Sequence, residues 1–232
     1  MPIFPALLIW STAMATPAEN PPSIDGALLP VGDACYTVPA SKQGKSAGNI
    51  LRRVERIDDK RLMITIASRF NGGPLLTSRI EVAFPSLQPT RTIEETDGKT
   101  DLSVRYRDGK ARGTVTGEDG RRQTTTVPLP GPVWDEETID FVLTALPLAE
   151  GAHFELPVFH FGRGPGVARI DVQRSISAEG LGGPIPAWEI EGSMRSDMTI
   201  TFLVAKADRR LLAVDVGGVR SALGGDCSGL SR

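Results

Sequence analysis

The chain has 232 residues, and its 26 basic and 28 acidic residues leave a formal net charge of -2. This balance excludes the strong positive field that draws a protein to nucleic acid, so we expect no nucleic-acid partner. A hydrophobic content of 40% with 23% charged residues excludes a disordered chain and is enough to bury a core without a metal.

Residues 1–18 have the features of a signal peptide. An apolar stretch over 3–10 is followed by small residues and by an Ala-Met-Ala triplet that ends at Ala15, which matches the preference of signal peptidase. No Lys or Arg precedes the apolar stretch, and a buried strand or short helix is the alternative interpretation. We expect cleavage after Ala15 or Ala18 and a periplasmic or secreted protein. No later apolar run is long enough for a transmembrane segment.

A Pro-rich arm, a short tail and two cysteines frame the rest of the chain. Residues 19–48 lack periodicity, which predicts an extended arm, and residues 221–232 form a C-terminal tail. Cys35 and Cys227 are the only cysteines. Two cysteines in an exported protein most often pair, so we predict a disulfide that ties the arm to the tail. Two unpaired, buried thiols are the alternative. A lipid anchor on Cys35 is excluded because Gly-Asp-Ala precedes it.

Alternating apolar and polar residues predict strands through the first half of the domain that we assign to residues 49–220. Three Asp-Gly pairs recur at an interval of eleven residues, beginning at Asp97, and each is followed by Lys or Arg. Two turn residues plus nine strand residues give this interval, which indicates a β-meander. Between the first two pairs, Leu102, Val104 and Tyr106 alternate with polar residues, so one face should meet the core and the other face water.

Residues 135–146 are predicted to form the single helix. Apolar residues fall at helical spacing over this segment, Asp135 can cap the first turn, and Pro147 ends the helix. A short amphipathic helix is not stable alone in water, so its apolar stripe must pack on a sheet.

Strand character returns after the helix. It covers 154–161, 167–176, 187–194, 198–204 and 210–216, with Gly-rich connections. The order of strands, helix and strands favours a mostly β fold, in which a curved antiparallel sheet or half-barrel surrounds one central helix. A β-sandwich of two sheets is the alternative.

Several motifs accompany the helix and the strands that follow it. They are Trp134-Asp135 before the helix, Leu146-Pro147-Leu148-Ala149-Glu150-Gly151, Gly162-Arg163-Gly164, Ala187-Trp188-Glu189-Ile190, Ile200-Thr201-Phe202 and Asp208-Arg209-Arg210-Leu211. With them, residues 49–219 resemble the exported bacterial family known as domain of unknown function 3108. The resemblance implies a periplasmic half-barrel, similar in shape to the lipoprotein carriers that shelter acyl chains. It implies no catalytic residues, and shape does not fix function. The Pro-rich arm and the flanking cysteines depart from the family pattern.

No pattern in the sequence predicts catalytic residues, a metal site or a cofactor. His153 and His160 have opposite parity on one predicted strand, so they should face opposite sides and cannot share a metal. We expect His160 to face the core. Ser193 lacks the second Gly of a nucleophile elbow. Paired carboxylates such as Glu94-Glu95 and Glu136-Glu137 are common on solvated surfaces, and we assign them no role beyond solubility. We therefore do not expect an enzyme.

Two hypotheses for the function remain. In the first, a lipid or another apolar ligand of the cell envelope binds between the sheet and the helix, which requires a cavity of a few hundred Å³. The residues expected to line that cavity are Ile139, Val142, Leu143, Leu146, Phe154, Leu156, Trp188 and Phe202, although the same residues could fill a closed core. In the second, the chain is an envelope scaffold or assembly factor that binds a protein partner, for example at a free strand edge.

Overall fold

The computed structural model describes residues 22–40, 47–117, 119–180, 182–194 and 199–230. The signal peptide expected at 1–18 lies outside these residues. All described strands belong to one sheet, in the order β8-β7-β6-β5-β4-β3-β2-β1-β15-β14-β13-β12-β11-β10-β9.

The strands of the first half run along the chain as a meander. They are β1 (Gly32–Val38), β2 (Gly48–Asp58), β3 (Arg61–Phe70), β4 (Leu76–Ala83), β5 (Pro89–Thr96), β6 (Lys99–Arg107), β7 (Lys110–Thr116) and β8 (Arg122–Pro128). Two of the three Asp-Gly pairs make the predicted two-residue turns, whereas Asp119-Gly120 lies in a longer connection between β7 and β8. Asp97 and Gly98 between β5 and β6, like Asp108 and Gly109 between β6 and β7, both adopt the positive φ of the tight hairpin turns that match strand twist.

The second half is another meander that returns to the first. Its strands are β9 (Trp134–Asp135), β10 (His153–His160), β11 (Gly164–Gly180), β12 (Gly183–Met194), β13 (Thr199–Ala205), β14 (Leu211–Val216) and β15 (Val219–Leu223). All neighbouring strands pair antiparallel except β9 and β10. The two halves join where β15 pairs with β1, with Tyr36 opposite Leu223.

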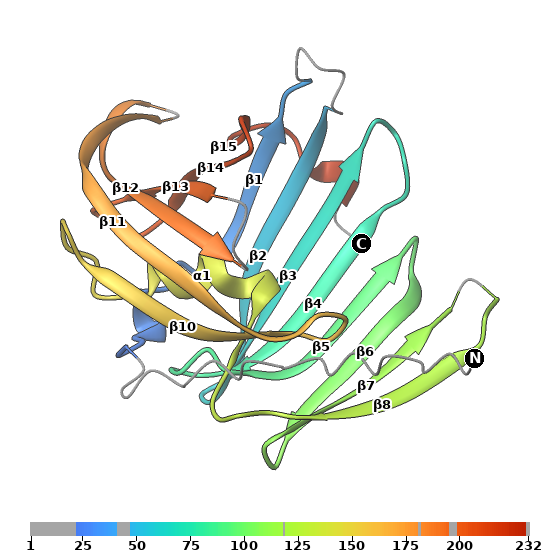
Figure 1. Ribbon diagram of the computed structural model, residues 1–232. Helices are drawn as coiled ribbons and strands as arrows, with labels where there is room; N and C mark the ends of the chain where they lie inside the picture. The colour runs from blue at the N-terminus through green and yellow to red at the C-terminus, as the bar shows by residue number, and fades with distance from the viewer. Residues whose placement is uncertain (1–21, 41–46, 118, 181, 195–198, 231–232) are drawn as a thin grey trace, which may run out of the picture.

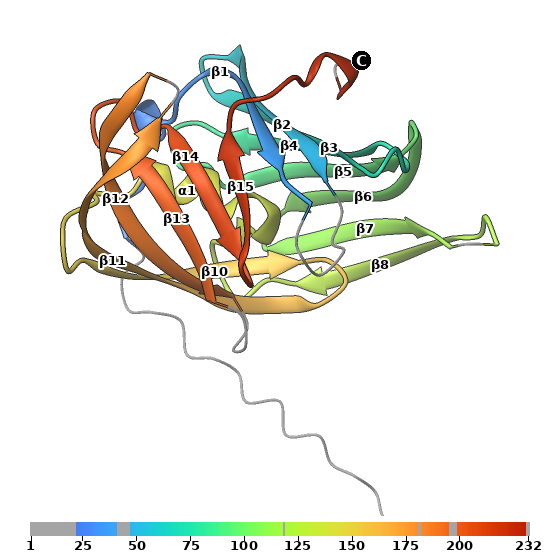
Figure 2. The same ribbon diagram turned by 90° about the horizontal axis from the view of Figure 1, so that it is seen from above.

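The sheet curves around the one α-helix of the described residues, α1 (Ile139–Thr144), which lies inside the curve (Figure 1). Viewed from above, β10–β15 cover one side of α1 and β1–β6 the other (Figure 2). The two ends of the sheet approach each other where the rings of Tyr106 and Phe159 meet edge to face, 6.0 Å apart, but the sheet is not closed by strand pairing. The curved antiparallel sheet with a central helix is confirmed.

The helix is shorter than predicted. A 3₁₀ turn, η2 (Glu136–Thr138), takes the place of its first turn, and α1 ends before the predicted limit at Leu146. Asp135 caps η2, because its carboxylate accepts a hydrogen bond from the backbone N–H of Glu137 at 3.0 Å. The capping role predicted for Asp135 is therefore confirmed at the 3₁₀ turn.

Part of the predicted arm belongs to the sheet. β1 lies between β2 and β15, and the segment before it, η1 (Gly26–Leu28), covers one end of the half-barrel. There the N–H groups of Asp25 and Gly26 donate to the carbonyls of Ala145 and Pro85. Leu29 thereby joins the core around α1. Residues 22–40 of the predicted arm are thus a structural part of the domain.

Cys35 and Cys227 form the predicted disulfide, with Cα atoms 5.7 Å apart and 192 residues between them in sequence. The bridge lies on the outer face of the sheet, where it packs with Leu51, Leu75 and Leu230. A third 3₁₀ turn, η3 (Ser228–Leu230), ends the described chain there. Within the described residues, no helix combines the length and the apolar character needed to cross a membrane.

Candidate functional site

The structure brings the eight predicted ligand-lining residues into one cluster. Six of them are buried together, and Phe154 and Trp188 are half-buried against the same cluster. The six buried residues are Ile139, Val142, Leu143, Leu146, Leu156 and Phe202. The eight residues thus lie together around α1.

Little free space remains between these residues. The cavity that Ile139, Leu143 and Phe202 line together with Met194 has a volume of about 10 Å³. That is room for about one water molecule, whereas pockets for drug-sized ligands have volumes of roughly 300 to 1,000 Å³. In the described part of the chain, α1 occupies the place that an apolar ligand would take.

The start of the helix is anchored to the sheet by a buried carboxylate. Asp135 is 4% exposed and accepts hydrogen bonds from the hydroxyls of Thr92 at 2.7 Å and Tyr106 at 2.9 Å. Burial raises the pKa of Asp135, and the hydrogen bonds from Thr92, the Glu137 amide and Tyr106 oppose that rise. Two strands, β5 and β6, thus supply the donors that hold the cap residue of η2.

A second carboxyl group lies beside this anchor on β5. Glu94 is half-buried on the concave face, and its burial, with the nearby Glu137, Asp135 and Asp101 carboxylates, raises its pKa to about 7. Glu136 is buried and lies 3.3 Å from the guanidinium of Arg163. Assigning Glu94 and Glu136 to a solvated surface was wrong, because the curved sheet encloses the start of the helix.

The first turn of α1 itself is held by a buried ion pair. The guanidinium of Arg52, on β2, contacts the carboxylate of Asp140, and their side chains are 14% and 8% exposed. Arg52 also lies over the rings of Tyr36 and Phe141, 5.3 and 5.4 Å from their centroids. Burial lowers the pKa of Arg52. Within the described chain, Asp140 Oδ1 has no hydrogen-bond partner, so the pair with Arg52 is the main compensation for this buried charge.

A small cavity of about 50 Å³ adjoins the ion pair, lined among others by Tyr36, Arg52, Asp140 and Arg209. It has room for water molecules but not for a substrate of ordinary size. A wider depression of about 550 Å³ lies on the outer side, beside the C-terminal segment. It is lined by residues of opposite charge, such as Arg69 and Asp226.

The two histidines lie apart, as their parity predicted. The His153 ring is paired with Asp171 at 2.7 Å on the surface. His160 is half-buried, and its Nδ1 accepts a hydrogen bond from the N–H of Gly162 at 3.1 Å. Among the residues that the structure describes, no group of three His, Cys, Asp or Glu side chains is placed to hold a metal ion.

The polar groups inside the half-barrel thus position the helix, each through a defined contact: Asp135 at its start, Glu136 beside it and Asp140 farther along. The role of Asp140 was not predicted because its partner, Arg52, is far away in sequence and lies on an alternating strand. The available signal was the position of Arg52, which strand alternation places on the same face as the buried Val54.

Comparison with known proteins identifies one family. A family model described as "Protein of unknown function (DUF3108)" matches residues 31–216. No curated protein and no solved structure matches the chain.

Proposed function

This chain belongs to the DUF3108 family, whose model covers most of its length, and we propose that it is a non-enzymatic binding protein of the cell envelope that takes up a partner strand along β8. The family itself has no established function. The proposal therefore depends on the surface and interior of this chain.

The observation that supports this proposal most strongly is the free edge of the sheet at β8. This strand pairs with β7 on one side and is the last strand of the sheet on the other. Its seven residues are exposed except for the half-buried Val127. Unpaired N–H and C=O groups along an edge are a template for another strand.

The edge also lacks the usual protection against pairing. Natural edge strands are commonly blocked by Lys, by Pro or by inward charges, yet the middle of β8 is Gln123 followed by three threonines, Thr124–Thr126, with Arg122 and Pro128 only at its ends. Threonine is β-branched and favours an extended strand. An unprotected, polar edge of this kind fits strand addition, in which main-chain hydrogen bonds provide the affinity.

The filled interior favours this proposal over an apolar ligand. Ligand binding between α1 and the sheet would require the helix to leave, because the two cavities beside it have volumes of only about 10 and 50 Å³. The buried Arg52–Asp140 pair and the Asp135 anchor both oppose that movement. An apolar ligand remains a hypothesis that needs a second conformation of α1.

Site-specific photo-crosslinking in the producing cells tests the strand addition. A crosslinking side chain at Thr125 on β8 should give a discrete adduct. The same group at the exposed Glu191 on β12, which is paired with Asp171 of β11 on one side and Thr201 of β13 on the other, should give none.

A pair of proline variants sharpens this test. Neighbouring residues of a strand point their N–H groups to opposite edges, so one of Thr124→Pro and Thr125→Pro breaks a hydrogen bond to β7 and the other removes a donor of the free edge. The variant that keeps the wild-type Tm should abolish an adduct formed from a probe at Gln123. Survival of the adduct in that variant, or no adduct from β8 at all, would overturn the proposal.

We also propose that the protein works in the periplasm. The signal peptide expected at residues 1–18 and the Cys35–Cys227 disulfide both fit an oxidising compartment. Fractionation of the producing cells, with the disulfide mapped in each fraction, tests this location. Recovery of reduced protein from the cytoplasm alone would contradict it.

A further inference from the structure

A row of arginines crosses the outer face of the sheet at β5, β6 and β7. Arg91 on β5 lies directly opposite Arg105 on β6, and Arg105 lies directly opposite Arg112 on β7. All three are exposed. Directly paired residues on neighbouring strands share one face, with Cβ atoms roughly 4.5 to 5.5 Å apart, so three guanidinium groups occupy adjacent positions.

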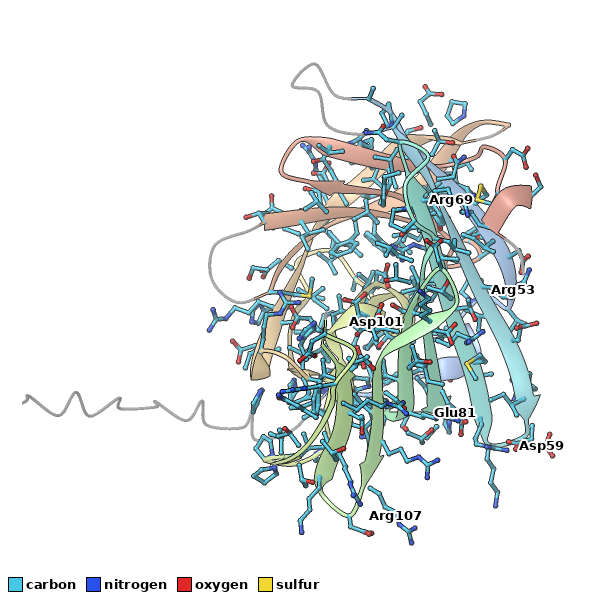
Figure 3. The ribbon with its side chains drawn as sticks, turned by 90° about the vertical axis from the view of Figure 1, so that its right-hand side faces the viewer. Arg53, Asp59, Arg69, Glu81, Asp101 and Arg107 are labelled. Carbon is cyan, nitrogen blue, oxygen red and sulfur yellow. A yellow bond between two sulfur atoms is a disulfide. The ribbon has the colours of Figure 1, made fainter. Side chains whose placement is uncertain are left out.

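Two further cations extend the row toward the β6–β7 turn. Arg107 and Lys110 are also directly opposite each other and exposed, and Arg107 projects from the tip of this hairpin (Figure 3). We call these five residues, Arg91, Arg105, Arg107, Lys110 and Arg112, the basic row.

The basic row has few acidic neighbours. Asp108, in the turn, lies 3.3 Å from Arg107. Glu81 is the cross-strand neighbour of Arg91, but its carboxylate is bound to Arg61 at 3.0 Å. In the described part of the chain, Arg91, Arg105 and Arg112 take part in no ion pair, whereas the outer face elsewhere carries matched pairs such as Arg53–Asp33 and Arg79–Glu95. Like charges placed directly opposite each other destabilise a sheet, so this arrangement lowers the stability of the isolated fold.

From this geometry we propose that the basic row binds the anionic headgroups of a phospholipid bilayer. Charge complementarity calls for an anionic partner. Protein interfaces combine Arg with aromatic residues, and single-stranded nucleic acids stack on aromatic rings. The outer face of β5–β7 presents Ile93, Ser103 and Thr114 beside the arginines, without an aromatic ring. Binding to an anionic lipid surface requires only that several cations lie on one face of the protein.

Vesicle co-sedimentation tests the proposal. The probes are vesicles of phosphatidylcholine alone and vesicles in which about a third of the lipid is phosphatidylglycerol. The variant Arg91→Gln/Arg105→Gln/Arg112→Gln removes three charges from the basic row. The matched control, Arg169→Gln/Arg174→Gln/Arg220→Gln, removes three exposed arginines that are each near an acid, Glu155, Glu189 or Asp215.

We expect binding to the anionic vesicles only, with loss of binding in about 0.5 M salt because screening shortens the range of charge interactions. Each surface arginine contributes about fivefold, so the basic-row variant should bind about a hundredfold more weakly. Its Tm should equal or exceed that of the wild type, since like-charge neighbours have been removed, which separates a binding defect from misfolding.

Three results would overturn the proposal. The first is no binding of the wild type to anionic vesicles. The second is an equal loss of binding in the basic-row variant and in the control, because a general charge effect would then explain it. The third is binding of polyglutamate without binding of vesicles, which would identify an acidic polypeptide as the partner. The vesicle test does not involve β8. Lipid binding can therefore fail while strand addition at β8 is confirmed, and strand addition can fail while lipid binding is confirmed.

Discussion

The Arg52–Asp140 pair gives the sharpest test of how α1 is held inside the sheet. Replacing Asp140 by Asn keeps the shape of the side chain but removes its charge, which leaves the guanidinium of Arg52 buried and uncompensated. Breaking a buried ion pair in this way costs about 3 to 5 kcal/mol. At about 2 to 4 °C per kcal/mol for a chain of this size, the Tm should fall by roughly 6 to 20 °C.

The double variant Arg52→Met/Asp140→Leu is the matched comparison. In the wild type, the rings of Tyr36 and Phe141 flank the guanidinium of Arg52. Met at this position should keep apolar contact with both rings, and the double variant buries no charge at either position. Replacing a buried pair by apolar residues of similar volume is often neutral or stabilising by about 1 to 4 kcal/mol. The double variant should therefore be at least as stable as the wild type.

Denaturant unfolding of the wild type, both single variants and the double variant measures the coupling between the two residues. We expect a strong, non-additive recovery in the double variant. A loss of less than about 1 kcal/mol in Asp140→Asn, or a double variant as unstable as the sum of the single ones, would show that the pair does not hold α1 in the way described.

Three more predictions concern the interior and the bridge. The folded-state pKa of Glu94, about 7, lies above its ordinary value of 4.5, so its contribution to stability is complete below about pH 4.5 and is lost as the pH rises through about 7. The wild-type Tm should fall across that window, and an unchanged slope in Glu94→Gln would contradict this cause. Closing a loop of 192 residues contributes up to about 5 kcal/mol by the chain-entropy model, so Cys35→Ser/Cys227→Ser should lower the denaturant midpoint, and a change below about 1 kcal/mol would refute that estimate. Leu143 is fully buried, so Leu143→Ala should cost about 2 to 5 kcal/mol in thermal unfolding; a neutral result would mean that the core contains unfilled space.

The meander could be predicted because its turns are encoded locally. An Asp-Gly pair specifies a two-residue turn because both residues tolerate a positive φ. Such a turn then fixes the register of the two strands that it connects. The pairing of Arg105 with Arg112 follows directly from the turn at Asp108 and Gly109. The basic row could therefore have been found in the sequence by counting outward from the turns.

β1 was missed because its partners are distant. The strand pairs with β15 through contacts such as Tyr36 with Leu223, which lie at opposite ends of the chain. Local composition, rich in Pro and Gly before it, indicated an arm, and no local pattern reports a non-local pairing. The prediction of the Cys35–Cys227 bridge was the one sequence signal that joined these two regions.

The polar interior could not be predicted from composition. Glu136 and Asp140 resemble the polar face of a surface helix, and that assignment holds only when one side of the helix meets water. Here the sheet encloses α1 from both sides (Figure 2), so Glu136 and Asp140 are buried and need partners, which are Arg163, between β10 and β11, and Arg52 on β2. Which partners they find depends on the curvature of the whole sheet.

Native mass spectrometry tests the central claim, that the chain fills its own interior and binds partners on its outside. The protein should be purified without detergent from the cells that produce it and measured in its folded charge states. We predict the mass of the bare processed chain. A stoichiometric adduct of lipid size that is released only on unfolding would contradict the claim.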